Sequence, residues 1–208
     1  MSDTRMTPES NIGSAASTRI GMLGGTFDPP HLGHLIVADQ VLHALSLTEI
    51  ILVPANEPWQ KVGTREITPA DKRLAMTQAA VGNAAGLSVS GIELELGGPS
   101  YTSVTLDALS EQRPADEWLV IVGADAALGL DTWHNTERLR EQATIVVVNR
   151  PGADFHPPTG WSWELVEIPS IGVSGTSLRR RVSQGNSVRF LTPEPVIAQI
   201  EEWNLYRG

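Results

Sequence analysis

Hydrophobic residues along this chain form two alternating kinds of pattern from residue 19 onwards. Short runs of consecutive apolar residues predict buried strands, and they occupy Arg19–Gly25, Glu49–Ala55, Glu117–Asp125, Thr144–Pro151 and Trp163–Pro169. The stretch Leu87–Leu96 alternates apolar and polar positions, which predicts one more strand.

Between these strands, apolar residues recur at the spacing of a helix. The predicted helices cover Leu32–Leu45, Thr68–Val81, Tyr101–Gln112, Thr136–Gln142, Ser174–Asn186 and Thr192–Tyr206. Thr68 is a suitable N-cap because Pro69 follows it at the first helical position. Thr192 is expected to cap the last helix in the same way, and Gly185 lies near the end of the helix that begins at Ser174.

The alternation of short strands with helices predicts an α/β fold, with a doubly wound parallel sheet, helices on both faces and a small C-terminal helical portion. We expect residues 19–208 to form a single domain. The first 18 residues are small and polar without a long apolar core, so we interpret them as a disordered leader.

Composition narrows the class of protein. The 208 residues are 41% hydrophobic, which suits a soluble globular domain, and no stretch is long and apolar enough for a membrane span. Cysteine is absent, which excludes disulfides, thiolate metal sites and cysteine nucleophiles. The net charge of −9 argues against a general nucleic-acid binder but allows a local site for a small anion. We expect a cytoplasmic protein.

The stretch GGTFDPPHLGH directly follows the first predicted strand. Gly24 and Gly25 allow a tight turn and close approach of a ligand, and the prolines make the return rigid. His31 and His34 lie three residues apart, with Gly33 leaving room between them. If a helix begins near His31, both imidazoles lie at its N-terminus beside free backbone N–H groups, which predicts an anion site.

Other interpretations of this stretch are a structural turn with two surface histidines and a metal site, for which no clear third ligand is present. The stretch lacks G-x-G-x-x-G, and no acidic residue ends the second strand, so it does not match a dehydrogenase fingerprint. It also lacks the Gly-Lys-Ser/Thr of a Walker A loop.

A second motif, VSGTSLRR, begins at Val173. Ser174 and Thr176 can cap a helix, and Arg179 then lies near its first turn. An ordinary capped basic helix is the other interpretation.

These two motifs resemble the signatures of the (T/H)xGH nucleotidylyltransferase superfamily, which has a Rossmann-like fold. The resemblance implies that the two histidines face the phosphates of ATP or CTP. It also implies that the Ser/Thr residues and Arg179 hold the β- and γ-phosphates. Gly175 stands where the superfamily has a second Ser, so we expect a backbone contact there without a hydroxyl.

Further stretches resemble the nicotinate-nucleotide adenylyltransferase family: VPANEPWQKV, GGPSYTSVTL, GADAALGLDTWHN and the closing FLTPEPVIAQIEEWNLYRG. The resemblance implies that Lys61 binds a phosphate of the acceptor and that Thr102 lies beside the nicotinate. It implies that Asp125 reaches the ATP ribose and that Trp133 stacks on the pyridine ring. His134 stands where a Tyr is common in the family.

The resemblance implies transfer of AMP from ATP to nicotinate mononucleotide, giving deamido-NAD and pyrophosphate. The implied catalytic residues are His31, His34 and Arg179. The implied ATP-binding residues are Gly24, Gly25, Thr26, Phe27, Gly33, His34, Gly123, Asp125, Ser174, Thr176 and Arg179. Mg²⁺ is expected on the ATP phosphates and water, without a dedicated protein metal site.

Three alternatives remain beside this hypothesis: an adenylyltransferase acting on phosphopantetheine, a non-catalytic nucleotide sensor, and a hydride-transfer enzyme. The two histidines and Arg179 argue against the sensor, and the missing glycine fingerprint argues against the hydride-transfer enzyme. The expected partners are ATP and the mononucleotide, with no nucleic acid and no membrane. A homo-oligomer is left open.

Overall fold

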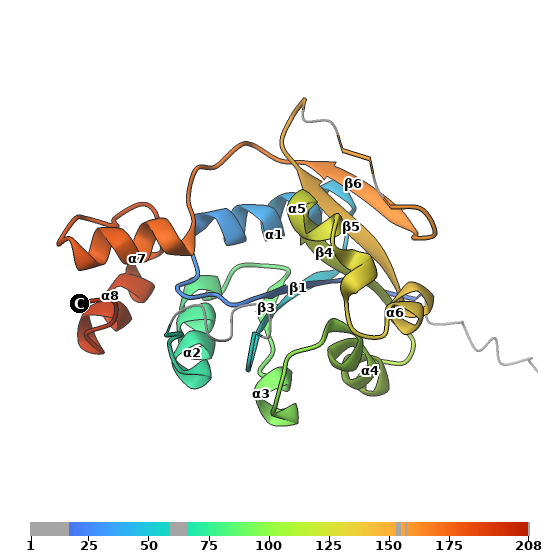
Figure 1. Cartoon of the computed structure of the whole chain (residues 1–208), viewed down its shortest axis with the longest axis horizontal. Helices are drawn as coiled ribbons and strands as arrows, with labels where there is room; N and C mark the ends of the chain where they lie inside the picture. The colour runs from blue at the N-terminus through green and yellow to red at the C-terminus, as the bar shows by residue number, and fades with distance from the viewer. Residues whose placement is uncertain (1–16, 59–65, 153–154, 157, 208) are drawn as a thin grey trace, which may run out of the picture.

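The computed structural model describes residues 17–58, 66–152, 155–156 and 158–207, and its centre is a parallel sheet (Figure 1). The six strands are β1 Arg19–Gly25, β2 Glu49–Pro54, β3 Leu87–Val89, β4 Glu117–Gly123, β5 Ala143–Asn149 and β6 Trp163–Glu167. Their order is β3-β2-β1-β4-β5-β6, and every neighbouring pair is parallel. The predicted α/β architecture is therefore confirmed.

Helices cover both faces of this sheet because successive strand residues point to opposite sides. On one face, Ile20 and Met22 pack with residues of α4 (Thr102–Gln112) and α6 (Thr136–Gln142). On the other face, Leu119 and Ile121 pack with residues of α1 (Leu32–Ala44) and α2 (Ala70–Val81). These two apolar clusters form the core.

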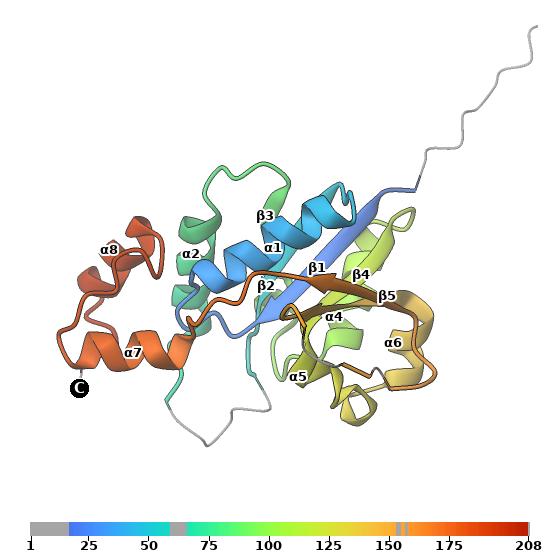
Figure 2. The ribbon, with the colours of Figure 1, turned by 90° about the horizontal axis from the view of Figure 1, so that it is seen from above.

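A small helical portion lies beside the sheet, as predicted. It consists of α7 (Gly175–Ser183) and α8 (Glu194–Glu202), drawn in orange and red in Figures 1 and 2. Val196 and Ile200 of α8 pack against Met76 and Ala80 of α2. The start of α7 lies next to the start of α1 in both views, which brings distant parts of the chain together.

The prediction of one strand over Leu87–Leu96 is wrong in its second half. Strand β3 ends at Val89, and a short helix, α3 (Ile92–Leu96), follows Gly91. Apolar and acidic residues alternate in this segment, but five residues are too few for alternation to separate a strand from a helical turn.

Two predicted helix caps are also wrong. Helices α2 and α8 begin at Ala70 and Glu194, each after a proline at the N-cap position without a side-chain cap bond. The hydroxyl of Thr68 instead donates to the Tyr206 hydroxyl, and that of Thr192 donates to the Pro30 carbonyl. Both hydroxyls thus donate to groups that are distant in the sequence instead of capping a helix.

The end of the fourth predicted strand also differs from the structure. Strand β4 ends at Gly123, and Ala124 and Asp125 already belong to α5 (Ala124–Ala127). A 3₁₀ turn, Leu130–Thr132, follows before α6. Asp125 therefore lies just beyond the end of a central strand rather than within it.

The predicted leader lies outside the described residues up to position 16. Within the part of the chain that the structure describes, no helix has the length and apolar character needed to cross a bilayer.

Candidate active site

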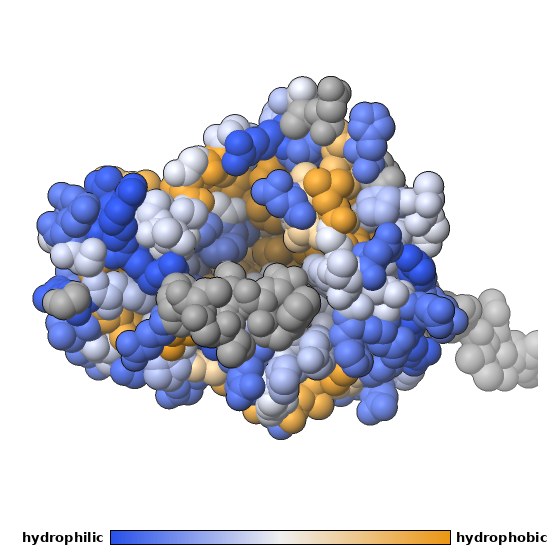
Figure 3. Space-filling model, viewed as in Figure 1, coloured by the Kyte–Doolittle hydropathy of each residue, from blue (hydrophilic) through white to orange (hydrophobic). Residues whose placement is uncertain are grey.

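A cleft of about 830 Å³ opens where the carboxyl ends of β1 and β4 lie side by side. The chain runs from β1 towards β2 on one side and from β4 towards β5 on the other, so this is the point where the strand order reverses. Open α/β sheets bind ligands at such a point. Figure 3 shows the hollow with apolar residues in its floor, which the cleft lining identifies as Leu23, Val120 and Val122 among others.

The turn after β1 forms one wall of the cleft. Gly24, Gly25 and Thr26 line it, and a Cβ added at Gly24 would meet no atom within 4 Å. A ligand can therefore approach the main chain closely at this position. We call residues 24–31 the phosphate turn.

The two histidines meet at the end of this turn. His31 is the N-cap of α1, and its ring stacks on that of His34 with 3.7 Å between centroids. A Cβ at Gly33 would lie 3.0 Å from Nδ1 of His31, so glycine makes room for the stacked pair. The predicted placement of both imidazoles at a helix N-terminus is confirmed.

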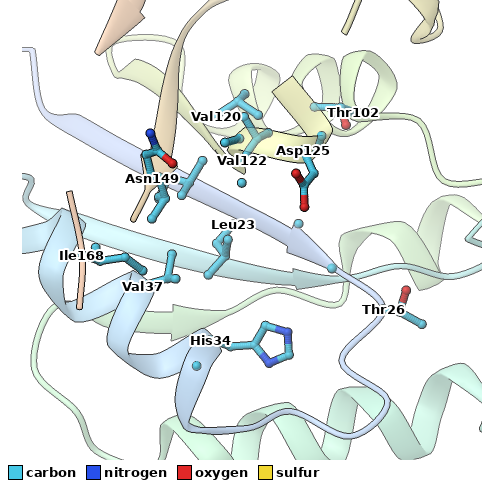
Figure 4. Close-up of a pocket in the computed structure, with 18 of the residues that line it drawn as sticks. Leu23, Thr26, His34, Val37, Thr102, Val120, Val122, Asp125, Asn149 and Ile168 are labelled. Carbon is cyan, nitrogen blue, oxygen red and sulfur yellow. The ribbon is translucent and has the colours of Figure 1, made fainter. Parts of the chain in front are cut away.

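The hydrogen bonding of His34 assigns its tautomer. The backbone N–H of His31 donates to Nδ1 of His34 at 3.1 Å. Because Nδ1 is the acceptor, the neutral ring carries its proton on Nε2. Figure 4 shows this ring beside the end of β1, on the opposite side of the strand from Asp125. His34 therefore brings one N–H donor to the cleft.

His31 differs from its partner in being buried, with 7% of its surface exposed. Burial lowers the pKa of its imidazole from 6.5 to about 4. The ring is therefore neutral near pH 7, and the stack does not bring two cations together.

The wall opposite the phosphate turn comes from α5, the 3₁₀ turn and the start of α4. Gly123, Asp125, Thr102 and Trp133 line the cleft there. Figure 4 shows Asp125 and Thr102 on this side. Trp133 is half-buried, packing partly against the core cluster beneath α4 and α6. One face of the cleft thus offers a carboxylate, a hydroxyl and a large ring.

His134 is held by the start of α4. Its ring stacks on Tyr101 with 4.3 Å between centroids, and the Ser103 hydroxyl donates to its carbonyl at 3.0 Å. These contacts fix the segment that carries Trp133. His134 therefore supports this wall as well as lining it.

The second motif, which begins at Val173, contacts the phosphate turn from α7. Ser174 is the N-cap of α7 and accepts from the Ser177 N–H, as predicted for a cap. The Arg179 guanidinium donates through Nη1 to the Asp28 carbonyl at 2.7 Å and through Nη2 to the Thr176 hydroxyl at 3.1 Å. Arg179 thereby joins α7 to the phosphate turn.

The structure thus brings together most of the predicted site residues. Those that line the cleft are Gly24, Gly25, Thr26, His31, Gly33, His34, Thr102, Gly123, Asp125 and Trp133. Four other predicted residues lie next to the lining rather than in it: Phe27, Ser174, Thr176 and Arg179. Phe27 is only 1% exposed, beneath the turn. Lys61 lies outside the described residues.

The sequence analysis missed several lining residues. Asn149 is the last residue of β5 and Arg150 follows it, while Ile168 to Ile171 follow β6. Their positions at the carboxyl ends of predicted parallel strands were the available signal, since that edge of the sheet carries the ligand. Arg150 is exposed and adds a cation to the cleft.

The described residues contain no group of three or more His, Asp or Glu side chains that could hold a metal ion. Asp125 and Glu93 are the carboxylates among the described residues that line the cleft. This donor set does not form a cage. It fits a Mg²⁺ ion that keeps phosphate and water ligands, the usual arrangement for this ion with a nucleotide.

Comparison with known proteins agrees with this geometry. A cytidylyltransferase-like family model matches residues 22–181. A relative from Exiguobacterium sibiricum, named a probable nicotinate-nucleotide adenylyltransferase, is 43% identical over 188 residues, covering 90% of this chain and 98% of the relative. A relative of the same name from a Roseiflexus species is 42% identical over 200 residues, covering 92% of this chain and 100% of the relative.

Among solved structures, the Plasmodium falciparum nicotinic acid mononucleotide adenylyltransferase complexed with NaAD superimposes with a TM-score of 0.72. It is 19% identical, and the match covers 91% of this chain and 97% of that chain. At this sequence identity, the structural similarity supports the assignment of the fold.

Proposed function

We infer that the cleft transfers AMP from ATP to nicotinate mononucleotide, because this chain belongs to the nicotinate-nucleotide adenylyltransferase family. The chain is accordingly a nucleotidyltransferase of NAD biosynthesis. The products are nicotinate adenine dinucleotide and pyrophosphate.

The observation that carries this proposal is the position of the His34 ring in the cleft. Its Nδ1 accepts from the His31 N–H, which fixes the ring, and the ring lines the cleft at the N-terminus of α1 beside an open glycine turn. A fixed donor beside helix N–H groups stabilises negative charge on a transferring phosphoryl group. This arrangement supports phosphoryl chemistry more than metal or hydride chemistry.

In the proposed reaction, a 5′-phosphate oxygen of the mononucleotide attacks the α-phosphorus of ATP. The new phosphorus–oxygen bond forms while the bond to the bridging oxygen of pyrophosphate breaks. Because the attacking phosphate is already an anion, the site needs no general base. The rate then depends on the placement of both substrates and on charge stabilisation at the α-phosphate.

The phosphate turn and α7 bind the ATP side in this proposal. Gly24 and Gly25 admit the phosphates, and His34 donates to the α-phosphate. Thr176 and Arg179 hold the pyrophosphate half, since a guanidinium has five N–H donors in a fork that suits phosphate oxygens. Asp125 accepts a hydrogen bond from the ATP ribose. Mg²⁺ bound to the phosphates and to water would supply further positive charge there, without a dedicated site on the chain.

The opposite wall binds the acceptor. Trp133 stacks on the pyridine ring, and Thr102 lies beside its carboxylate. The half-buried position of Trp133 supports this role, because its indole is anchored on the core while part of it faces the cleft. Lys61 is proposed to bind the acceptor phosphate on the strength of the sequence motif alone.

Pyrophosphate release in the presence of ATP and Mg²⁺ tests the proposal. Nicotinate mononucleotide, nicotinamide mononucleotide and phosphopantetheine are offered in parallel at matched concentrations. We expect strong turnover with nicotinate mononucleotide. Turnover only with phosphopantetheine would keep the ATP side and overturn the roles of Trp133 and Thr102. Binding of ATP without turnover of any acceptor would indicate a nucleotide sensor.

A further inference from the structure

A ring of hydrogen bonds surrounds Phe27 on the side of the phosphate turn away from the cleft. Arg73 of α2 donates through Nη1 to the Thr26 carbonyl at 2.9 Å and through Nε to the Thr68 carbonyl at 2.7 Å. The Thr68 hydroxyl donates to the Tyr206 hydroxyl at 3.3 Å, which in turn donates to the Asp28 carboxylate at 2.6 Å. We call Arg73, Thr68, Tyr206 and Asp28 the turn brace.

Three residues of the turn brace are buried and Tyr206 is half-buried, so its bonds are strong constraints. Arg73 is 1% exposed and Asp28 is 4% exposed. Arg73 also donates through Nη2 to the Asn56 carbonyl at 2.9 Å. A buried guanidinium or carboxylate that loses a partner is left with an unsatisfied charge, so these groups resist any displacement that breaks their contacts.

The Tyr206 hydroxyl stays protonated near neutral pH and can donate. Burial, followed by the charge of Asp28, raises the pKa of its hydroxyl far above its usual range. The neutral hydroxyl thus continues to donate to the Asp28 carboxylate.

The brace holds the two residues that flank an unfavourable backbone conformation. Thr26 and Asp28 lie on either side of Phe27, whose φ of 47° is in the left-handed region that a bulky residue seldom adopts. Such a conformation persists only where its surroundings over-determine it. The brace fixes the carbonyl on one side and the carboxylate on the other.

Phe27 transmits this constraint to the cleft. Its ring lies edge-on to the His34 ring, with 4.8 Å between centroids and a 66° angle between planes. A Cβ at Gly25 would lie 3.0 Å from the same ring, so Phe27 also packs directly beneath the turn's main chain. Rotation of Phe27 would therefore move both His34 and the glycine turn.

We propose that Arg73 and Tyr206 are positioning residues that act through Phe27 to hold the His34 imidazole at the phosphates. Neither residue lines the cleft, and they come from α2 and from the segment after α8. Together they couple the C-terminal helical portion to the site of phosphoryl transfer. The kinetic part of this inference rests on the proposed function.

The test uses Tyr206→Phe, which keeps the ring and removes the hydroxyl, and Thr68→Val, which removes a single bond of the brace. The matched control is Thr77→Val on α2. Thr77 is buried, and its hydroxyl donates to the main-chain carbonyl of Arg73 within its own helix, not to any side chain of the brace. All three variants remove one hydrogen-bonded hydroxyl with little change in volume.

Two measurements are made on each full-length variant: steady-state kinetics of pyrophosphate release, and the imidazole NMR signals of His34 without ligand. In Tyr206→Phe we expect kcat to fall about tenfold with KM for ATP changed less than about twofold, since misplaced donors cost most in the transition state. The His34 signals shift in Tyr206→Phe and, to a smaller extent, in Thr68→Val. Neither quantity changes in Thr77→Val.

Unchanged His34 signals or unchanged kcat in Tyr206→Phe would overturn the proposal, as would equal effects in Thr77→Val. The NMR arm needs no substrate, so it separates the two claims. Wild-type protein without activity on any acceptor, combined with shifted His34 signals in Tyr206→Phe, would refute the proposed function and retain the brace. Arg73→Lys keeps the charge but loses the fork of donors, and if it folds we expect a larger loss than in Tyr206→Phe.

Discussion

The buried imidazole of His31 makes the stability of this protein sensitive to mild acid. Burial lowers the pKa of His31 from 6.5 to about 4 in the folded protein, while the unfolded chain keeps a value near 6.5. Between these two values the unfolded chain binds a proton that the folded protein does not. Acidification from pH 7 therefore favours unfolding, and the loss continues until the pH falls below about 4.

The size of this effect follows from the separation of the two pKa values. A difference of about 2.5 units corresponds to a limit of about 3.4 kcal/mol at low pH. At pH 5 nearly all unfolded chains carry the proton and few folded molecules do, which gives a loss of about 2 kcal/mol relative to pH 8. This is a sizeable part of the roughly 5–15 kcal/mol that stabilises an ordinary domain.

His31→Asn isolates this contribution. Asparagine does not titrate, and it is a favoured residue at the N-cap position that His31 occupies. The control is His43→Asn in the last turn of the same helix, where the side chain is 72% exposed. Apart from Asp39, whose exposed carboxylate lies 3.5 Å from His43, carboxyl groups that lose ion pairs in acid contribute equally to all three proteins and cancel in the comparison.

Urea unfolding at pH 8, 7, 6 and 5 measures the free energy of unfolding of each protein. We expect wild type and His43→Asn to lose about 2 kcal/mol more than His31→Asn between pH 8 and pH 5. Parallel pH profiles for wild type and His31→Asn would refute the reasoning, because they would mean that His31 titrates normally in the folded protein.

Three further predictions concern the reaction itself. His34→Ala should lower kcat by about 10²-fold or more through loss of one electrostatic donor, measured by pyrophosphate release at saturating substrates; near-normal turnover would contradict its role. Gly175→Ala should lower kcat/KM for ATP about tenfold, because its Cβ would lie 2.9 Å from the Asp28 carbonyl and push α7 from the phosphate turn. The control Gly172→Ala meets no atom within 4 Å and should leave that ratio unchanged. Trp133→Ala should raise KM for the mononucleotide about three- to tenfold, because one aromatic stack contributes about 0.5–1.5 kcal/mol to binding, while KM for ATP stays constant. Equal changes in both KM values would mean that Trp133 only packs in the core.

Local sequence patterns were sufficient for the parts of the molecule that depend on near neighbours. His31 and His34 are three residues apart at a helix start, and this spacing predicted that both imidazoles lie at the helix N-terminus, where the structure shows their rings stacked. Buried strands such as β4 were equally predictable, since five consecutive residues of that strand are buried. The ends of elements were less predictable, as the helix α3 in a predicted strand demonstrates.

Long-range partners account for what the sequence did not reveal. Thr68 and Thr192 have the local pattern of helix caps, yet their hydroxyls bond Tyr206 and Pro30, which are 138 and 162 residues away. Arg73 reads as an ordinary helical arginine, and only the fold places its guanidinium behind the phosphate turn. Arg150, by contrast, lies at the carboxyl end of a predicted strand, so its place at the ligand-binding edge of the sheet could have been predicted.

An acidic protein can bind a polyphosphate here because the local charges differ from the overall charge of −9. Helix α1 begins at the phosphate turn, and α7 begins beside it, with the Val173 carbonyl 3.7 Å from a Cβ added at Gly33. Each helix start directs a partial positive charge towards this region. Arg179 adds a full positive charge where it bonds Asp28, and Arg150 adds another within the cleft. The acidic residues elsewhere act through water and salt across longer distances, where screening weakens them. The position of two helix starts and two guanidinium groups, rather than the net charge, thus decides which ligand this cleft accepts.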